Sequence, residues 1–156
     1  MKSKGQSLIE LTAGLMILIP IVLLCIDCGT LFLGLTVNNS ACRDACRAAA
    51  AGQPGQLAAG TRTLAAGDEP YKRSATVVRK CYKANGAIRL DPNITVTETI
   101  RAPVPAAPYG GAVDGEVTVE TQVDIYPPFL IGYMMPAGVI LTTRQTFPYT
   151  WHMDPS

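Results

Sequence analysis

The most pronounced pattern in the chain is an uninterrupted apolar stretch near its amino terminus. Leu11–Val37 spans 27 residues, and Asp27 is the only charged residue among them. As an α-helix with a rise of ~1.5 Å per residue, the stretch would be roughly 40 Å long, which exceeds the ~30 Å hydrocarbon core of a bilayer. We therefore predict a transmembrane helix. Lys2 and Lys4 before it place the amino terminus in the cytoplasm and the rest of the chain outside.

Beyond the apolar stretch, the helical pattern continues as an amphipathic stalk. Small and apolar residues recur at steps of three and four, while Arg43 and Arg47 lie off this stripe. The stripe consists of Leu31, Leu35, Asn38, Cys42, Ala45 and Ala49. Gly52 and Pro54 are expected to end the helix. The glycine- and alanine-rich segment 53–67 is then predicted to be a loop or a frayed helical turn.

A second, shorter helix is predicted to start at Asp68-Glu69-Pro70 and to run to about Ala84, with Asn85-Gly86 as its stop. The start provides a capping carboxylate, an acid in the first turn, and a proline where its missing N–H costs least. The apolar face consists of Tyr71, Ala75, Val78, Cys81 and Tyr82, and the basic residues are Lys72, Arg73, Arg79, Lys80 and Lys83. A solvated surface is the expected reason for the basic residues, with lipid headgroups or nucleic acid as the alternatives.

After Gly86 the pattern changes from helical to alternating, which indicates β-strands. Ile88–Leu90 and Ile94–Thr97 are predicted as short strands, and 102–111 as a proline-rich loop. Glu116–Ile125 and Val139–Phe147 are predicted as longer strands. In the first of these, the residues expected on one face are Val117, Val119, Thr121, Val123 and Ile125. We therefore predict an α+β fold with a long N-terminal transmembrane and stalk helix, a second short helix and a small antiparallel β-sheet.

The connection between the two longer strands, Pro127–Gly138, is almost entirely apolar. Its central segment Phe129–Met135 is too short to cross a bilayer. We expect it to pack over the sheet as part of the core. The alternatives are that it lies on the membrane surface or contacts a neighbouring subunit.

The composition excludes several classes of function. A formal net charge of +1 argues against a general nucleic-acid binder, which carries a strongly basic domain. The chain has one histidine, no glycine-rich phosphate loop and no Gly-x-Ser-x-Gly elbow. We therefore expect no enzyme activity, no cofactor and no nucleic-acid partner.

The chain has five cysteines. Cys25 and Cys28 have the spacing of a redox motif, but they lie inside the apolar stretch, where a soluble redox partner could not reach them. Cys42 and Cys46 share one face of the stalk, and Cys81 lies on the apolar face of the second helix. A disulfide from Cys81 to Cys42 or Cys46 would suit an oxidising exterior, although it leaves one stalk cysteine free. With His152 these thiols match no established zinc spacing, so we expect no metal site.

Two residues are unusual for a helix that only anchors the chain. Glu10 lies at the very start of the apolar stretch, and Pro20 lies inside it, where it removes one helical hydrogen bond. A carboxylate near hydrocarbon usually has a partner or a function, the alternative being an interfacial position among headgroups. Asp27 is expected near the outer interface or facing another helix.

The segment Lys4-Gly5-Gln6-Ser7-Leu8-Ile9-Glu10 resembles a type IV prepilin processing site. In that family a short basic leader ends in glycine, and glutamate is the fifth residue of the mature chain. The resemblance implies that prepilin peptidase cuts between Gly5 and Gln6 on the cytoplasmic side. It also implies that the apolar helix serves first as a membrane anchor and later as the core helix of a filament.

A wider resemblance extends over residues 5–51, about a third of the chain. Gly5–Glu10, the Leu18–Leu24 segment with its isoleucine-proline step, and the Ala41–Ala50 helix are similar to the pattern of TadE-like proteins. These are minor pilins or pseudopilins of tight-adherence (Flp-type) pilus systems. The filament-assembly residues that the resemblance implies are Glu10 and Pro20.

The resemblance implies a division of the chain into a prepilin leader (1–5), a transmembrane and filament-core helix (6–37), a helical stalk (38–52) and a small α+β extracytoplasmic domain (53–156). The implied partners are prepilin peptidase, membrane lipid, the inner-membrane pilus assembly platform, and other pilin subunits bound through N-terminal helices. Gly14, Gly29 and Gly34 would permit those helices to approach closely. The chain would reside in the inner membrane and then in an extracellular adhesion pilus. The alternative is a membrane-anchored binding domain that never enters a filament.

Overall fold

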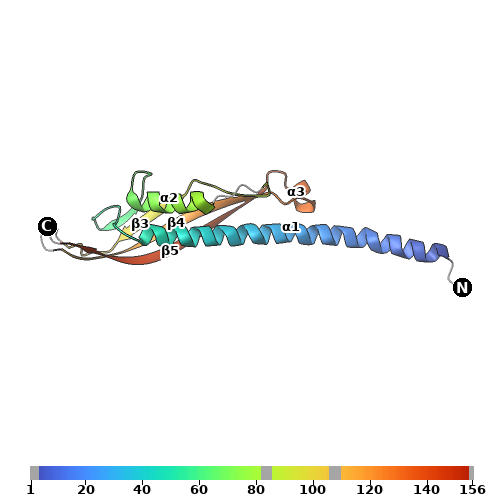
Figure 1. Ribbon diagram of the computed structural model, residues 1–156, viewed down its shortest axis with the longest axis horizontal. Coiled ribbons are helices and arrows are strands. Elements are labelled where there is room, and N and C mark those ends of the chain that lie inside the picture. Colours follow the sequence, from blue (N-terminus) through green and yellow to red (C-terminus); the bar gives the residue numbers. More distant parts are fainter. Residues whose placement is uncertain (1–3, 82–85, 106–109, 155–156) are drawn as a thin grey trace.

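The computed structural model describes residues 4–81, 86–105 and 110–154 of the chain. The helices are α1 (Lys4–Ala50), α2 (Glu69–Cys81) and α3 (Leu130–Met134), and the strands are β1 (Gly60–Thr63), β2 (Ile88–Leu90), β3 (Thr95–Ile100), β4 (Gly111–Ile125) and β5 (Val139–Met153). Figure 1 shows α1 as a single long helix whose amino-terminal half extends beyond the rest of the molecule. The predicted α+β fold is confirmed.

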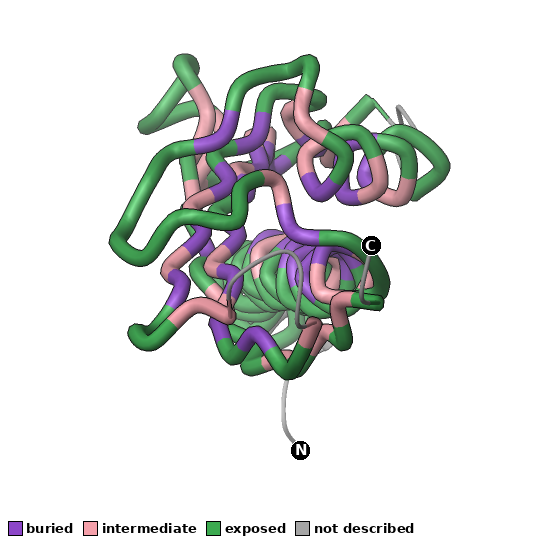
Figure 2. Tube along the Cα trace, turned by 90° about the vertical axis from the view of Figure 1, so that its left-hand side faces the viewer, coloured by how far each residue is buried: buried purple, intermediate pink, exposed green. Residues whose placement is uncertain are grey.

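All strands of the sheet pair in antiparallel fashion around β4. Strand β5 runs beside β4 along its full length, from Gly111 opposite Met153 to Ile125 opposite Val139. The other edge of β4 is shared by β3 and the short β2, and β1 extends the sheet from β3. Figure 2 shows that the sheet curves around α1, with α2 lying next to α1 at the open side.

The core lies between the stalk part of α1 and the concave face of the sheet. The alternating face predicted for β4 is buried in full, from Val117 to Ile125, whereas Glu116 and Gln122 on the other face remain partly exposed. The facing residues of α1 are small: Ala41, Cys42, Ala45, Cys46 and Ala49. Small side chains allow the helix backbone to approach the sheet closely, so valine and isoleucine of β4 fill the space between them.

The structure corrects one prediction about α1 and bears on a second. Leu35, assigned to the buried stripe, is 38% exposed, and Gly34 is buried in its place. A methyl group added to Gly34 would overlap with the side chain of Ile125, whereas Gly14 and Gly29 face open space. Gly34 therefore permits a close approach within the chain itself. Its predicted role in helix packing between subunits is not needed to explain the residue.

The predicted loop 53–67 is also wrong in part, because it contains β1. All four residues of β1 are exposed, so it shows no apolar alternation. It forms because pairing with β3 satisfies its backbone groups at one edge. Strand β5 extends six residues beyond its predicted end and includes Pro148, which an edge strand tolerates since one side of its backbone is unpaired. The predicted end of the second helix, 82–85, lies outside the described residues.

Candidate functional site

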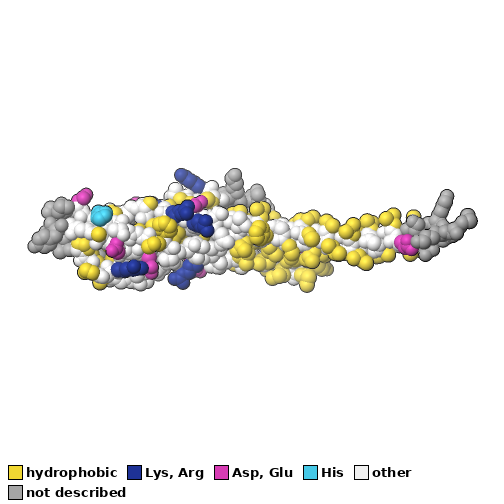
Figure 3. All heavy atoms as spheres, turned by 90° about the horizontal axis from the view of Figure 1, so that it is seen from below, with side chains coloured by type: hydrophobic (Ala, Val, Ile, Leu, Met, Phe, Trp, Pro, Cys, Tyr) yellow, Lys and Arg dark blue, Asp and Glu magenta, His cyan; other side chains and the backbone are white. Residues whose placement is uncertain are grey.

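The amino-terminal half of α1 presents an exposed apolar surface. Every residue from Leu8 to Val22 is exposed, including large side chains such as Ile9 (70%) and Met16 (75%). The helix is long and apolar enough to span a membrane. Figure 3 shows hydrophobic side chains covering this part of α1. An exposed apolar surface of this size is typical of a segment that contacts lipid or other proteins.

The residues predicted for processing and assembly lie at and near the free end of this helix. Gly5 and Gln6 belong to the first turn of α1, and Glu10 follows Gln6 by four residues. The Glu10 side chain is exposed and forms no ion pair with any residue in the described part of the chain. Pro20 is exposed too, and α1 continues through it without a break. The Glu10 carboxylate is therefore open to a group from another molecule.

Asp27, the only charge in the apolar stretch, is fully buried against α3. The backbone N–H of Phe129 donates to Oδ1 at 2.9 Å, and that of Ile131 donates to Oδ2 at 2.7 Å. Each carboxylate oxygen thus accepts a charge-assisted hydrogen bond. The expectation that Asp27 faces another helix is met by a helix of the same chain. The sequence showed that this carboxylate needed a partner but did not identify one 102 residues away.

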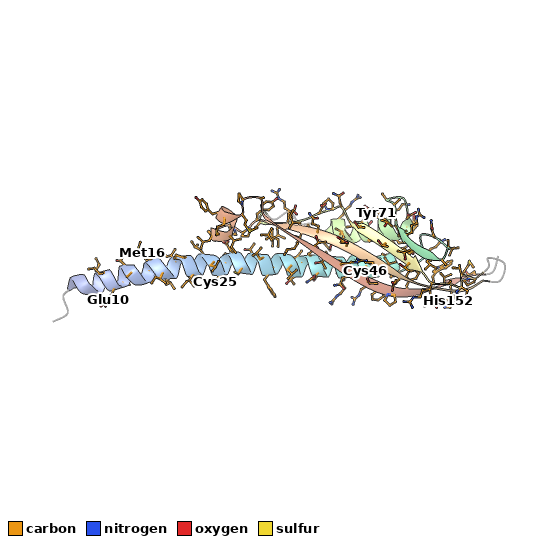
Figure 4. All side chains as sticks on the ribbon, turned by 180° about the vertical axis from the view of Figure 1, so that it is seen from behind. Glu10, Met16, Cys25, Cys46, Tyr71 and His152 are labelled. Atoms are coloured by element: carbon orange, nitrogen blue, oxygen red, sulfur yellow. The ribbon has the colours of Figure 1, made fainter. Side chains whose placement is uncertain are left out.

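The segment Phe129–Met135 does not pack over the sheet, as the core-packing expectation required. Its helix α3 packs against α1 beside Asp27. Tyr133 and Met134 are 90% and 80% exposed, so their side chains contribute nothing to the core. Figure 4 shows α3 alongside α1 at the level of Cys25. The inner face of the sheet is already covered by α1, and Asp27 holds this segment through two backbone hydrogen bonds.

Three polar side chains on the stalk form a ladder of hydrogen bonds to the sheet. Asn38, Cys42 and Cys46 are spaced by four residues, and all three are buried. The thiol of Cys42 donates to the carbonyl of Val119, and that of Cys46 to the carbonyl of Val117, both at 3.2 Å. Four helical residues rise ~6 Å and two strand residues ~6.7 Å, so the two repeats stay in step over this length.

Asn38 is the best-connected member of the ladder. Its Nδ2 donates to the carbonyl of Leu141 at 3.0 Å and to Oγ1 of Thr143 at 3.1 Å. Its Oδ1 accepts a hydrogen bond of 2.7 Å from the hydroxyl of Thr121. This amide therefore joins α1 to both β4 and β5, one turn after Gly34 meets Ile125 of β4. The sequence placed Asn38 on the correct face without indicating these partners.

The cysteines do not form the predicted disulfide. All five are free, and Cys81 is exposed at the end of α2 while Cys42 and Cys46 point into the sheet. The stripe that carries the two stalk cysteines could have packed against α2 or against the sheet. In the structure both cysteines pack against the sheet. Burial raises the pKa of both stalk thiols, which keeps them protonated and able to donate. They are packing residues of low reactivity.

Helix α2 contributes one basic residue to the end of α1. The guanidinium of Arg73 donates to the carbonyls of Ala48 (3.1 Å), Ala49 (2.9 Å) and Gln53 (3.0 Å). The carbonyls of Ala48 and Ala49 lie in the last turn of α1, where they have no partner within the helix and where the helix dipole favours a cation, and that of Gln53 lies three residues beyond the helix end. One of the residues assigned to a solvated basic face therefore caps the stalk.

A buried carboxylate that the sequence did not reveal connects β3, β5 and the segment after α1. Glu98 of β3 accepts from the hydroxyl of Tyr149 at 2.7 Å and from the N–H of Gly55 at 2.9 Å. Burial, together with this hydrogen bond, raises the pKa of Tyr149. The burial of Glu98 could have been inferred from its place in an alternating strand, because Val96 and Ile100, two residues away on either side, are buried. With both oxygens occupied, Glu98 holds three segments in place.

Figure 4 places His152 toward the end of the domain beyond Cys46, so these residues do not converge. Across residues 4–81, 86–105 and 110–154, no three His, Cys, Asp or Glu side chains gather in a way that would hold a metal ion. The feature that calls for a partner is thus the apolar half of α1 with Glu10. Comparisons of the chain with family models, with curated proteins and with solved structures find no match.

Proposed function

We propose that this chain is a minor pilin or pseudopilin of a tight-adherence, type IV-like pilus. After prepilin peptidase removes residues 1–5, the subunit assembles into, initiates or caps the filament. The observation that carries the proposal is the division of one helix into two halves. The half with Glu10 is exposed and apolar, and the other half is fixed to the sheet.

Glu10 is what favours a filament over a simple anchor. Cleavage after Gly5 would leave a positively charged amine on Gln6. Moving that amine from the membrane edge into a bundle of apolar helices would cost several kcal/mol if it stayed unpaired. The exposed carboxylate of Glu10 supplies the opposite charge, from a neighbouring subunit in register. A helix that only anchors a binding domain gains nothing from a charge at this position.

The attachment of the stalk also supports the proposal. A filament subunit must carry its outer domain in a fixed orientation relative to its core helix, because neighbouring copies pack against both. Arg73 caps the end of α1, and Asn38 ties the stalk to β4 and β5. The domain is thus held at two points on one continuous helix.

The first test is the mature amino terminus, determined by mass spectrometry on protein from cells that contain an active prepilin peptidase. We expect the chain to begin at Gln6, and the Gly5→Leu variant to remain uncut. Wild-type protein that still begins at Met1 or Lys2 would overturn the pilin proposal. The membrane-anchored binding domain would then be the better description.

The second test concerns Glu10 after cleavage. Glu10→Ala is expected to insert and to be cleaved normally, yet to fall by more than about tenfold in sheared filaments, since each ~1.4 kcal/mol is a factor of ten. Glu10→Asp should be intermediate because its shorter side chain reaches less far. Thr12→Ala is the matched control, since it alters an exposed residue of the same turn without changing the charge. Equal recovery of Glu10→Ala and Thr12→Ala in filaments would refute the proposed pairing.

A further inference from the structure

The segment Phe129–Met135, here called the α3 lobe, projects a group of apolar side chains that the domain does not use. Besides Tyr133 and Met134, the residues Phe129, Leu130 and Met135 are exposed. The sequence from Pro127 to Leu141 contains no charged residue. On a domain surrounded by water, such a lobe would expose apolar surface at a cost of ~25 cal/mol per Å². Its exposure therefore calls for an apolar environment.

The place of the lobe along α1 identifies that environment. If the hydrocarbon core begins at Leu11, directly after Glu10, its ~30 Å extend over about 20 residues of helix and end near Leu31. The lobe contacts α1 at Asp27, one turn short of that end. It therefore lies at the depth of the outer leaflet. Figure 3 shows the hydrophobic surface continuing from α1 onto the part of the domain at this level, without a charged side chain between.

We infer that the α3 lobe is a second membrane contact, embedded in the outer leaflet of the bilayer that α1 crosses. The carboxylate of Asp27 can lie at this depth because two backbone N–H groups of the lobe donate hydrogen bonds to it. The phenol of Tyr133 suits the headgroup region, where tyrosine is enriched in membrane proteins. The lobe contacts lipid, because its exposed side chains are aromatic, leucine and methionine residues without charge. The inference rests on the membrane span within the proposed function and not on filament assembly.

The test uses the tryptophan content of the chain. Its single tryptophan, Trp151, lies in β5 twelve residues beyond Val139, which places it ~40 Å along the strand from the lobe. Trp151→Phe removes it, and in that background Tyr133→Trp moves the only indole to the lobe. Tyr133 is 90% exposed, so the larger ring fits without repacking. A third protein, Leu18→Trp with Trp151→Phe, marks the span itself.

Each full-length protein is reconstituted into vesicles of phosphatidylethanolamine and phosphatidylglycerol in equal parts, with and without phosphatidylcholine brominated near the headgroup end of its acyl chains. We expect bromine to quench the Tyr133→Trp variant at least half as strongly as the Leu18→Trp variant, and to leave wild-type Trp151 unchanged. Quenching of Leu18→Trp without quenching of Tyr133→Trp would overturn the inference alone. If Leu18→Trp also escaped quenching, the membrane span would fail, and the proposed function with it.

Discussion

Asn38, Cys42 and Cys46 show how single side chains attach a largely apolar helix to a sheet. A carbonyl that is already paired within the sheet accepts a further hydrogen bond only from a donor of small size that lies directly above it. A thiol on a helix of alanines meets that requirement, since its neighbours Ala41 and Ala45 allow the close approach. Cysteine is therefore used here as a small, weakly polar packing residue.

The buried thiols predict a pH dependence of stability. Burial raises their pKa above the ordinary value of 9.0, so the folded protein retains protons that the unfolded chain loses. Their contribution to stability is complete below that ordinary value and is lost as the pH rises through the folded pKa. We expect the free energy of unfolding to fall above about pH 9, as measured by urea titration of the full chain in detergent micelles.

The control for this prediction is a pair of variants. In Cys42→Ala/Cys46→Ala the decline between neutral and alkaline pH should be smaller than in wild type, whatever the variant costs in overall stability. Cys81→Ala should retain the full decline, because Cys81 is exposed. A decline that is unchanged in the double variant would assign the pH dependence to other groups.

At the scale of the elements, the contact between α1 and β4 depends on Gly34. A Cβ at this position would overlap with the side chain of Ile125, so Gly34→Ala should force a shift that costs about 1–3 kcal/mol. Gly29→Ala is the control, because nothing lies near its Cβ position and alanine favours a helix by ~1 kcal/mol. We expect Gly34→Ala to unfold at lower urea concentration than Gly29→Ala. Equal midpoints would mean that Ile125 moves aside freely.

The elements that the sequence predicted are those whose burial follows a regular period. Strand β4 was predicted from Glu116 to Ile125 because one of its faces is buried against α1 over this length, which imposes strict alternation. Strand β1 was missed because all of its residues are exposed, so its sequence shows no alternation. Helix α3 was missed because its position depends on the hydrogen bonds to Asp27 and its sequence shows no helical periodicity. The cysteines were assigned to the correct face of α1 but to the wrong partner. A stripe indicates that a side is buried and does not identify the element that buries it.

The candidate site was predicted in a similar way. Glu10 and Gly5 were identified by their spacing between a basic leader and an apolar run, and Asp27 by its charge inside that run. Arg73 and Glu98 were missed in these roles, because their partners are distant in sequence and, apart from the hydroxyl of Tyr149, are backbone groups. Every residue except proline carries both a backbone donor and a backbone acceptor, so the residue type does not show which of them takes part.

At the scale of the whole molecule, Asp27 joins the apolar half of α1 to α3, which connects β4 to β5 at the end of the sheet nearest that half. Asp27→Ala would leave the N–H groups of Phe129 and Ile131 without their acceptors in an apolar setting. We expect these two amides to exchange with deuterium more than about tenfold faster than in wild type, a change of ~1.4 kcal/mol or more in the free energy of local opening. The measurement is made by NMR on the full chain in detergent micelles.

Asp27→Asn should restore part of the protection, since an amide retains one acceptor oxygen. The amide of Val119 in the centre of the sheet serves as the internal reference and should exchange at an unchanged rate. Equal acceleration at Val119 would indicate general destabilisation, and no acceleration at Phe129 and Ile131 would show that the carboxylate does not hold α3.

The direction of α1 relative to the sheet has a mechanical consequence. The stalk runs parallel to β5 and antiparallel to β4, so a pull along the helix axis acts along the strands. Asn38, Cys42 and Cys46 are then loaded in shear, all at the same time. A pull across the sheet would break them one after another. A subunit drawn out of a bilayer by its helix would experience the first kind of load, which this geometry resists best.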